Sequence, residues 1–309
     1  MLKIENLTKK YGKFKAVDNI SLEINEGEIF GFVGPNGAGK TTTFKMISTL
    51  LKATSGNIYL DGTEINHKNL KKVRSNIGYM PDFFGVYDKL KVNEYMDFYS
   101  DIAGFNRSEK VSIIKDLLEL VDLTNKKNAY VDSLSRGMKQ RLCLARCLIH
   151  NPKLLILDEP ASGMDPRARV QMKEILRELK KMGKTIIISS HILPELSELC
   201  TNIGIIEGGK IVVNGSVEEI MHRAKGASVI RIEVLGEKEK CIRFLKEEPL
   251  IKSVIEEERY IEIEFSGELK EVSNLVKRVL DANIPVISFK PIENNLEDIF
   301  MEVTRGDGE

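Results

Sequence analysis

The first part of the chain alternates apolar and polar residues in short runs that predict β-strands. Period-two patterns cover residues 2–7 and 17–24. The continuous apolar run over residues 29–33 is typical of a strand that is buried on both faces. A glycine-rich loop follows this run, and apolar residues then recur at helical spacing from Phe44. The pattern therefore predicts a strand, a glycine loop and a helix in direct succession.

The middle of the chain changes to helical periodicity and then to a regular alternation. Helical spacing predicts three helices, over residues 91–103, 109–121 and 137–150. After Pro152 the predicted order is strand 154–157, helix 166–181, strand 185–189, helix 192–200 and strand 203–207. Such alternation is typical of a sheet with parallel strands and covering helices. We therefore predict an α/β core with a mixed sheet and a helical subdomain at about residues 83–150.

A different pattern begins beyond Gly226. The predicted order there is strand 229–235, helix 238–247, strands 251–257 and 260–266, helix 269–282 and strand 285–290. Two helices interleaved with four strands in this order predict a small α+β domain of the ferredoxin-like type. We therefore place the first domain at residues 1–225 and a C-terminal accessory domain at residues 226–309.

The charge of the chain supports the same boundary. The sequence has 309 residues, with 46 Lys plus Arg and 46 Asp plus Glu, so its formal net charge is zero. Residues 226–309 hold 12 basic and 19 acidic residues, a balance of −7, and the first 225 residues hold 34 and 27, a balance of +7. The neutral total argues against a protein that coats nucleic acid, so we predict no nucleic-acid partner.

Apolar runs and cysteines indicate the compartment. The longest apolar runs, such as residues 154–157, are far shorter than the roughly 18 residues that a membrane span needs. The first residues lack the basic flank and apolar core of a signal peptide. The four cysteines show no metal-binding CxxC spacing. We therefore expect reduced thiols and a cytoplasmic location.

The glycine loop carries the first chemical motif. Gly34, Gly39, Lys40 and Thr41 fit the pattern G-x-x-x-x-G-K-T between a strand and a helix, which is the phosphate loop of nucleotide-binding proteins. Its backbone N–H groups wrap the phosphates, the lysine reaches the β- and γ-phosphates, and the threonine hydroxyl joins the Mg²⁺ shell. The predicted ATP contacts in this loop are Gly34, Pro35, Asn36, Gly37, Ala38, Gly39, Lys40, Thr41 and Thr42.

Two carboxylates follow the apolar strand at residues 154–157. Asp158 and Glu159 would lie at the carboxyl end of that strand, where α/β proteins bind ligands. Alone, such a pair is more often an ordinary helix cap. Downstream of a phosphate loop, it predicts that Asp158 holds Mg²⁺ and that Glu159 orients or deprotonates the attacking water.

A segment ahead of these carboxylates resembles the signature of the ATP-binding cassette (ABC) family. The usual signature is LSGGQ, and this chain keeps Leu134, Ser135 and Gly137 but departs from it at Arg136 and Met138. Alone, the segment would be an ordinary Ser-capped helix, whose N-terminus favours an anion. The resemblance implies that Ser135 and Gly137 contact the γ-phosphate bound by an opposite subunit.

Further motifs of that family occur in the same order over residues 1 to about 225. Asp165 ends a segment that resembles the family's D-loop, His191 matches its switch histidine, and Tyr11 matches the aromatic residue that stacks on adenine. Asp82 stands where the family normally has a glutamine. The resemblance implies a catalytic role for His191 beside Lys40 and Glu159, nucleotide contacts for the other three residues, and a water-mediated contact of Asp82 with Mg²⁺.

Two segments indicate a membrane partner. Residues 81–98 are unusually aromatic, and in the family this region receives a helix of the membrane subunit. The residues that mark the segment are Phe83, Phe84, Val86, Tyr87, Tyr95 and Phe98. The tail from Glu293 to Phe300 resembles the S-L-E-D-x-F ending of ATPases that pair with separate type-2 exporter membrane subunits. Short aromatic segments and closing helices also occur simply as core.

The resemblance as a whole implies an ATP-hydrolysing subunit of an exporter. Two copies, or one copy and a second ATPase subunit, would close around two ATP molecules with Mg²⁺ and drive type-2 exporter-like membrane subunits. The chain would then lie on the inner face of the cell membrane through those subunits.

The sequence also allows two other functions. A soluble ABC ATPase could act on ribosomes, DNA or an assembly complex, although the chain has neither a second cassette nor a long coiled-coil insertion. The acidic C-terminal domain could also make the protein chiefly a regulatory binder.

Overall fold

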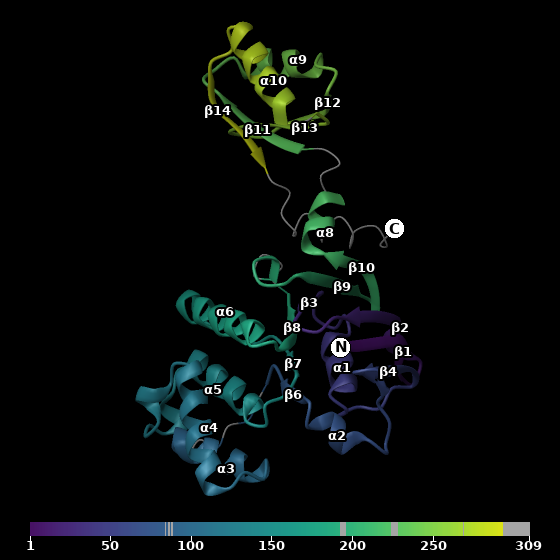
Figure 1. Ribbon diagram of the computed structural model, residues 1–309. Helices are drawn as coiled ribbons and strands as arrows, with labels where there is room; N and C mark the ends of the chain where they lie inside the picture. Colours follow the sequence, from purple (N-terminus) through teal and green to yellow (C-terminus); the bar gives the residue numbers. More distant parts are fainter. Residues whose placement is uncertain are drawn as a thin grey trace. The chain divides into compact units, whose positions relative to one another are not determined.

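The chain forms two compact units, which are described separately below. Figure 1 shows the computed structural model, which describes residues 1–292 except 84, 86, 88, 192–195, 224–227 and 268. The units comprise Met1–Val217 and Glu218–Glu309. The division falls a few residues ahead of the boundary predicted from pattern and charge at 225/226.

A six-stranded sheet forms the centre of the first unit. Its order is β10 (Lys210–Ser216), β9 (Asn202–Glu207), β3 (Ile29–Val33), β8 (Thr185–Ser190), β7 (Leu154–Leu157) and β6 (Ile77–Met80). All neighbouring strands are parallel except the antiparallel edge pair β9–β10. Every residue of β3, β7 and β8 is buried, as expected for parallel strands covered on both faces. The predicted mixed sheet is therefore confirmed.

A second, antiparallel sheet packs into the same core. Its order is β2 (Phe14–Ile24), β1 (Leu2–Tyr11), β4 (Ser55–Leu60) and β5 (Thr63–Glu64). Strands β1 and β2 are longer than predicted, because register shifts after Ile4 and Leu7 interrupt the period-two pattern on which the prediction relied. The short or amphipathic strands β4, β5 and β10 were not predicted. One cluster of buried side chains joins the sheets, including the Phe32–Phe44 ring contact at 5.8 Å.

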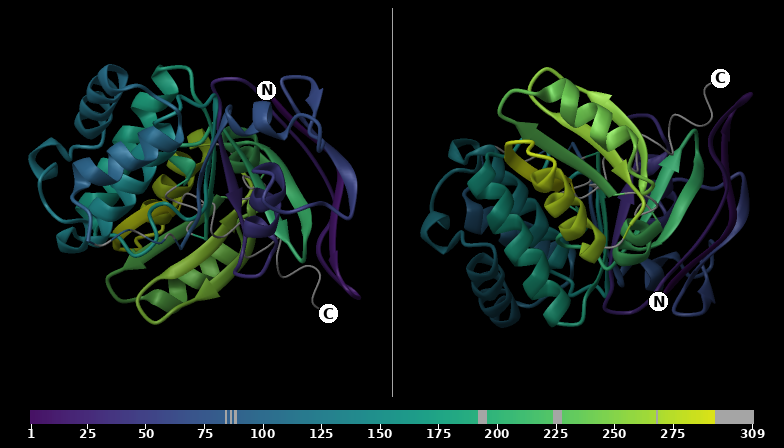
Figure 2. Two further views of the ribbon diagram at one scale, coloured as in Figure 1. Left: turned by 90° about the horizontal axis from the view of Figure 1, so that it is seen from below. Right: turned by 90° about the horizontal axis from the view of Figure 1, so that it is seen from above.

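The helices of the first unit lie close to the predicted positions, except the short helix over residues 70–74, which was not predicted. They are α1 (Lys40–Ile47), α2 (Leu70–Arg74), α3 (Val92–Ile102), α4 (Arg107–Leu120), α5 (Arg136–Leu148) and α6 (Pro166–Lys181), with short 3₁₀ turns at Thr124–Lys126 and Val131–Ser133. Helices α3 to α5 form the predicted helical group on one side of the sheet, visible in both views of Figure 2. The helix predicted over 192–200 lies partly outside the described residues. Among the described residues, no helix has the length and apolar character of a membrane span.

The second unit has the predicted ferredoxin-like topology. It begins with α8 (Val217–Arg223) at the junction and continues with β11 (Ser228–Val234), α9 (Lys238–Lys246), β12 (Ile251–Glu256), β13 (Ile261–Phe265), α10 (Leu269–Asp281) and β14 (Val286–Ile292). The four strands form an antiparallel sheet in the order β12-β13-β11-β14. Apolar side chains of the central strands alternate with polar ones and pack against α9 and α10. This unit therefore has its own hydrophobic core.

We expect Leu275→Ala to destabilise the second unit selectively. Leu275 on α10 is fully buried in that core, so its truncation should lower the local free energy of unfolding by about 2–5 kcal/mol. Hydrogen–deuterium exchange should show faster exchange in peptides from α9, β13 and α10, with no change in β3 and β7. Leu280→Ala is the matched control, because Leu280 lies on the same helix and is 51% exposed. Equal exchange in both variants would contradict this description of the core.

Candidate functional site

The register of the central strands brings three loops together. Parallel pairing places Val33 of β3 beside Ser190 of β8, and Leu157 of β7 beside Ile188 of β8. Because these strands run in one direction, their carboxyl ends meet at one edge of the sheet. The phosphate loop, the Asp158–Glu159 pair and His191 each follow one of these strands directly. The fold therefore gathers the predicted chemical residues of three distant segments.

The phosphate loop needs glycine at two positions for steric reasons. A Cβ atom at Gly34 would lie 2.2 Å from the Ile206 carbonyl oxygen. Gly39 has a φ of +110°, and a Cβ there would lie 2.5 Å from the Ala16 carbonyl oxygen. Only glycine allows this close approach of backbone to backbone. Helix α1 begins directly after Gly39, so its free N–H groups face the loop.

Lys40 is a buried cation held by its own loop. Its Nζ donates hydrogen bonds to the carbonyl oxygens of Gly34 at 2.6 Å and Pro35 at 3.1 Å. The Glu159 Oε1 atom lies 3.7 Å from the same ammonium. Burial lowers the pKa of Lys40, and the carboxylates of Glu159 and Asp158 oppose that shift. Phosphate oxygens are stronger acceptors for this ammonium than the two neutral carbonyl oxygens.

Ser189 links the two carboxylate residues, and the sequence analysis did not identify it. Its Oγ donates to Asp158 Oδ1 at 2.7 Å and accepts a hydrogen bond from the Glu159 backbone N–H at 2.9 Å. Ser189 and Asp158 are both almost completely buried. The sequence did contain a signal for this role, namely a polar residue near the end of a strand whose central residues are apolar. Its hydroxyl fixes the first carboxylate and the backbone of the second.

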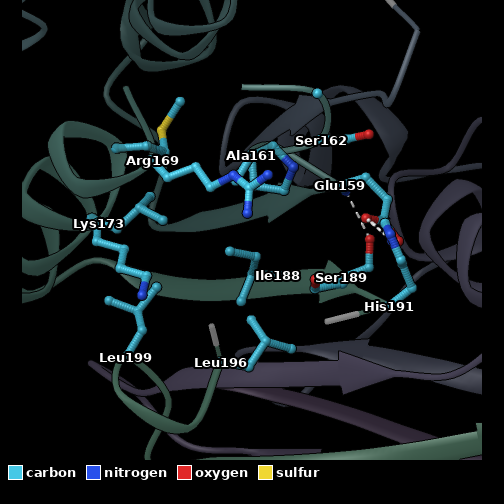
Figure 3. A pocket seen from close by; sticks show the side chains of 15 residues that line it. Glu159, Ala161, Ser162, Arg169, Lys173, Ile188, Ser189, His191, Leu196 and Leu199 are labelled. Carbon is cyan, nitrogen blue, oxygen red and sulfur yellow. Dashed lines mark hydrogen bonds and ion pairs between the residues drawn. The ribbon is translucent and has the colours of Figure 1, made fainter. Parts of the chain in front are cut away.

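Glu159 is positioned between Lys40 and His191. Its Oε2 lies 2.9 Å from His191 Nδ1, and the backbone of Glu159 has a φ of +50°, which is uncommon for a residue other than glycine. Figure 3 shows the His191 ring and the Glu159 carboxylate lying against each other beside Ser189. The predicted catalytic residues Glu159, His191 and Lys40 are therefore neighbours.

A cavity of about 370 Å³ lies over the phosphate loop. Its walls contain these predicted residues: Tyr11, Pro35, Asn36, Gly37, Ala38, Gly39, Lys40, Thr41, Thr42, Asp82, Asp158 and Glu159. Phe14 also lines it and was not predicted. Tyr11 and Phe14 are paired across the β1–β2 hairpin and are 51% and 64% exposed. Two exposed aromatic rings at one edge of the cavity are suited to contact a nucleotide base.

The oxygen atoms around Asp158 fit a divalent cation. Asp158 Oδ2 and Glu159 Oε1 are buried and accept no hydrogen bond from any residue that the structure describes. Thr41 and Asp82 line the same cavity. No group of three or more His, Cys, Asp and Glu side chains among the described residues could hold a metal alone. Mg²⁺ typically takes one or two carboxylates and completes its shell with phosphate and water, so the residues present suit it.

The predicted contact Gly34 does not line this cavity, and three further predicted nucleotide contacts lie outside the phosphate loop and outside the cavity. Ser135 caps the N-terminus of α5, where its Oγ accepts a hydrogen bond from the Met138 N–H at 3.3 Å. Gly137 lies in the first turn of α5, and Asp165 caps α6 by accepting from the Ala168 N–H at 3.0 Å. None of the three lines the cavity over the phosphate loop. One chain therefore does not bring these residues to its own Lys40.

Arg136, where the chain differs from the usual family signature, packs on a neighbouring loop. A Cβ atom at Gly163, where φ is +66°, would lie 2.5 Å from the Arg136 guanidinium carbon. The arginine side chain thus packs directly on the loop between β7 and α6. Gln140 of the same helix donates to the Ser162 carbonyl oxygen at 3.0 Å. Helix α5 and this loop are therefore tied together.

Only some residues of the aromatic segment at 81–98 are exposed. Tyr95 is fully buried, whereas Tyr87 and Phe98 are exposed and their rings meet edge to face at 5.4 Å. Phe83 is also exposed. Phe84, Val86 and the tail from Glu293 to Phe300 lie outside the described residues. Tyr95 is therefore core, and the exposed rings remain a candidate docking surface.

Two sequence families match this chain. The first, described as "ABC transporter", matches residues 17–162, which include the phosphate loop, the signature segment and both carboxylates. The second, described as "ATP-binding protein DrrA1-3-like, C-terminal domain", matches residues 215–304. The first match lies within the first compact unit, and the second spans most of the second unit.

Proteins similar to this chain along almost its full length are also known. The linearmycin resistance ATP-binding protein LnrL of Bacillus subtilis is 34% identical over 98% of both chains. The bacitracin transport ATP-binding protein BcrA of Bacillus licheniformis is 34% identical over 99% of this chain and 98% of its own. Among solved structures, the dimeric ATP-binding cassette MJ0796 bound to ADP and Pi is 26% identical, with a TM-score of 0.64 over 70% of this chain and 99% of its own.

We expect Ser189→Ala to destabilise the first unit. The substitution leaves Asp158 Oδ1 and the Glu159 N–H without their shared partner, which should lower the free energy of unfolding by about 1–3 kcal/mol. Urea denaturation followed by circular dichroism measures the change. Ser112→Ala, at an exposed serine of α4, should change stability by less than about 0.5 kcal/mol. A loss at Ser189 no larger than at Ser112 would contradict the assigned network.

Proposed function

The chain belongs to the ABC transporter family, and we propose that it is the ATP-hydrolysing subunit that powers an exporter. The observation that carries the proposal is the convergence of Lys40, Asp158 and Glu159 over one cavity in a chain that resembles resistance and transport ATPases along its full length. The similarity includes the second unit, which argues for an exporter subunit over a soluble ABC ATPase of another kind.

ATP would occupy the cavity over the phosphate loop. The loop N–H groups and the N-terminus of α1 supply hydrogen-bond donors and positive partial charge to the phosphates. The buried Lys40 ammonium would exchange its carbonyl partners for phosphate oxygens. Tyr11 and Phe14 would contact the adenine ring at the exposed edge of the cavity.

Hydrolysis would use the carboxylates at the end of β7. Asp158, with Thr41 and Asp82, would hold Mg²⁺, which supplies positive charge to the phosphate oxygens when bound. Glu159 is suited to accept the proton of the attacking water, because its Oε1 atom accepts no hydrogen bond from any described residue. Asp158 would hold the cation, so Glu159 would not be needed as a metal ligand. His191 would hold Glu159 in place through the 2.9 Å contact.

A second copy, or a second ATPase subunit, would complete each site. Ser135 and Asp165 are exposed helix caps, and Gly137 is a buried residue in the first turn of α5; none of the three lines the cavity over the phosphate loop of its own chain. The N-terminus of α5 is suited to an anion, so it would meet the γ-phosphate bound by the other subunit. The similar cassette MJ0796 is dimeric in a post-hydrolysis state bound to ADP and Pi. ATP binding would thereby close the two subunits, and hydrolysis would release them.

Separate membrane subunits of the type-2 exporter class would carry the cargo. The exposed rings of Phe98, on helix α3, and of Tyr87, which contacts it, offer an apolar docking surface for a helix of such a subunit. The chain would then lie on the inner face of the cell membrane through this contact. The names of its relatives, one for linearmycin resistance and one for bacitracin transport, favour export as the direction.

We expect Glu159→Gln to separate ATP binding from hydrolysis. Loss of the proton acceptor should lower the rate of ATP hydrolysis by about 100-fold or more, while ATP binding stays near normal. The variant should accumulate as an ATP-bound dimer with Mg²⁺, detected by size-exclusion chromatography with light scattering. Glu119→Gln, at an exposed residue of α4, is the control and should behave as the unmodified chain. A Glu159→Gln variant that hydrolyses ATP normally, or stays monomeric even beside its membrane partner, would sink the proposal.

We also expect the chain to copurify with a membrane protein that has about six apolar segments of roughly 20 residues. The double substitution of Tyr87 and Phe98 to Ala should reduce copurification at least tenfold and leave ATP binding unchanged. Val170→Ala, at an exposed apolar residue of α6, is the control. Undiminished copurification of the double variant would show that the subunit docks elsewhere.

A further inference from the structure

The exposed Tyr11 ring at the edge of the nucleotide cavity is in contact with a cation of its own strand. Lys9 Nζ lies 5.2 Å from the centroid of the Tyr11 ring, within the range of a cation–π contact. The same ammonium donates a hydrogen bond to the Lys52 carbonyl oxygen at 2.7 Å. A lysine side chain without contacts moves among many rotamers, so the second contact keeps the ammonium against the ring. The ring is therefore held in place although about half of Tyr11 is exposed.

The carbonyl group that anchors Lys9 belongs to the segment that follows helix α1. This helix begins directly after the phosphate loop and has Lys45 in its last turn. The backbone N–H groups of Leu50 and Leu51 both donate to the Lys45 carbonyl oxygen, at 2.8 and 3.0 Å. Lys52 is the next residue in the chain. Hydrogen bonds thus connect the helix at the phosphate loop, through Lys52 and Lys9, to the ring at the exposed edge of the cavity.

The strand that carries Tyr11 has two further contacts with the same segment, and neither uses the Lys9 side chain. The Lys10 N–H donates to Thr54 Oγ1 at 3.0 Å, and the Thr54 N–H donates to the Thr8 carbonyl oxygen at 2.8 Å. These contacts and the pairing of β1 with β2 hold the backbone of the hairpin. Loss of the Lys9 ammonium would therefore release the ring without displacing the strand.

Lys9 contacts the ring from outside the cavity. Tyr11 lines the cavity over the phosphate loop, whereas Lys9 does not. The ring therefore keeps a surface for a nucleotide base, and the phosphates would lie at Lys40 in the phosphate loop. The two lysines thus have different tasks, because Lys9 acts on the ring and Lys40 acts on the phosphates.

We propose that Lys9 is the positioning residue for the base, and that it fixes the Tyr11 ring where the base of a bound nucleotide stacks. This inference rests on the proposed function, because it requires a nucleotide in the cavity. A ring that is already ordered loses less conformational entropy when the base binds, so the Lys9 contact raises the affinity for the nucleotide. An ammonium that attracted only the phosphates would act equally on a ligand without a base.

The test compares ADP with inorganic pyrophosphate, both with Mg²⁺, on the full-length chain. ADP has the base that pyrophosphate lacks, and ATP hydrolysis does not consume it. Isothermal titration calorimetry should show that Lys9→Met weakens ADP binding about threefold, as expected for the loss of an exposed cation–π contact. Pyrophosphate binding should be unchanged. In steady-state kinetics the KM for ATP should rise about threefold with kcat unchanged, because the base contact is the same before and during the reaction.

Three further variants separate the ring contact from the charge. Tyr11→Ala should weaken ADP binding about tenfold, and adding Lys9→Met to it should change nothing more, because the ammonium then has no ring to hold. Lys9→Arg should keep the affinity of the unmodified chain, because a guanidinium also contacts aromatic rings and donates to a carbonyl oxygen. Lys10→Met removes the same charge from the adjacent exposed residue and should leave ADP binding unchanged. Circular dichroism establishes that each variant is folded.

Each outcome of this comparison bears on the proposal. A loss of affinity for ADP alone, which Lys9→Arg avoids and which disappears in the Tyr11→Ala background, supports it. Unchanged ADP binding in folded Lys9→Met protein, an equal loss for pyrophosphate, or an equal loss in Lys10→Met would overturn it. ADP that binds the unmodified chain no more tightly than pyrophosphate would overturn both the proposal and the base contact of Tyr11. The expected pattern with ADP in a chain that does not hydrolyse ATP would count against the proposed function alone.

Discussion

The structure depends on the burial of three parallel strands, β3, β7 and β8. Their side chains are buried without exception, so their backbone groups must pair with one another, and that pairing fixes the register of all three. The phosphate loop, the two carboxylates and His191 follow the strand ends directly. The positions of the reacting groups are thus a consequence of core packing, and a one-residue slip in any of the strands would move its loop and turn its side chains to the other face.

Burial also explains why the site is ready to bind a charged ligand. Lys40 and Asp158 are nearly inaccessible to water, where an unpaired charge is costly, and their partners only partly satisfy them. Lys40 has two carbonyl oxygens and, at 3.7 Å, the Glu159 carboxylate as partners, whereas Asp158 has the Ser189 hydroxyl for one of its two oxygens and no hydrogen bond to the other from any described residue. A nucleotide would offer Lys40 stronger acceptors than the carbonyl oxygens, and its cation would supply the positive charge that Asp158 lacks.

Much of this architecture could be predicted from sequence patterns. The buried strands, the helices α3 to α6 and the ferredoxin-like order of the second unit follow from apolar periodicity, and the chemical residues follow from motifs in their strand-to-helix context. Strands β4, β5 and β10 could not be predicted, because they are short or mix polar residues into the pattern. Ser189 and Phe14 were missed because their roles arise from pairing across strands that are distant in sequence or folded back at a hairpin. Arg136 packs on Gly163 through a contact that no linear motif encodes.

The central claim is that one chain carries an incomplete site, with Ser135 and Gly137 acting on the nucleotide of another subunit. The most direct test is the rate of ATP hydrolysis per chain over a dilution series of the purified protein, with the association state followed by analytical ultracentrifugation. A site completed by a second subunit predicts that the rate per chain falls toward zero as the protein dissociates, because association follows mass action. A constant rate per chain in protein that sediments as a monomer would contradict the claim.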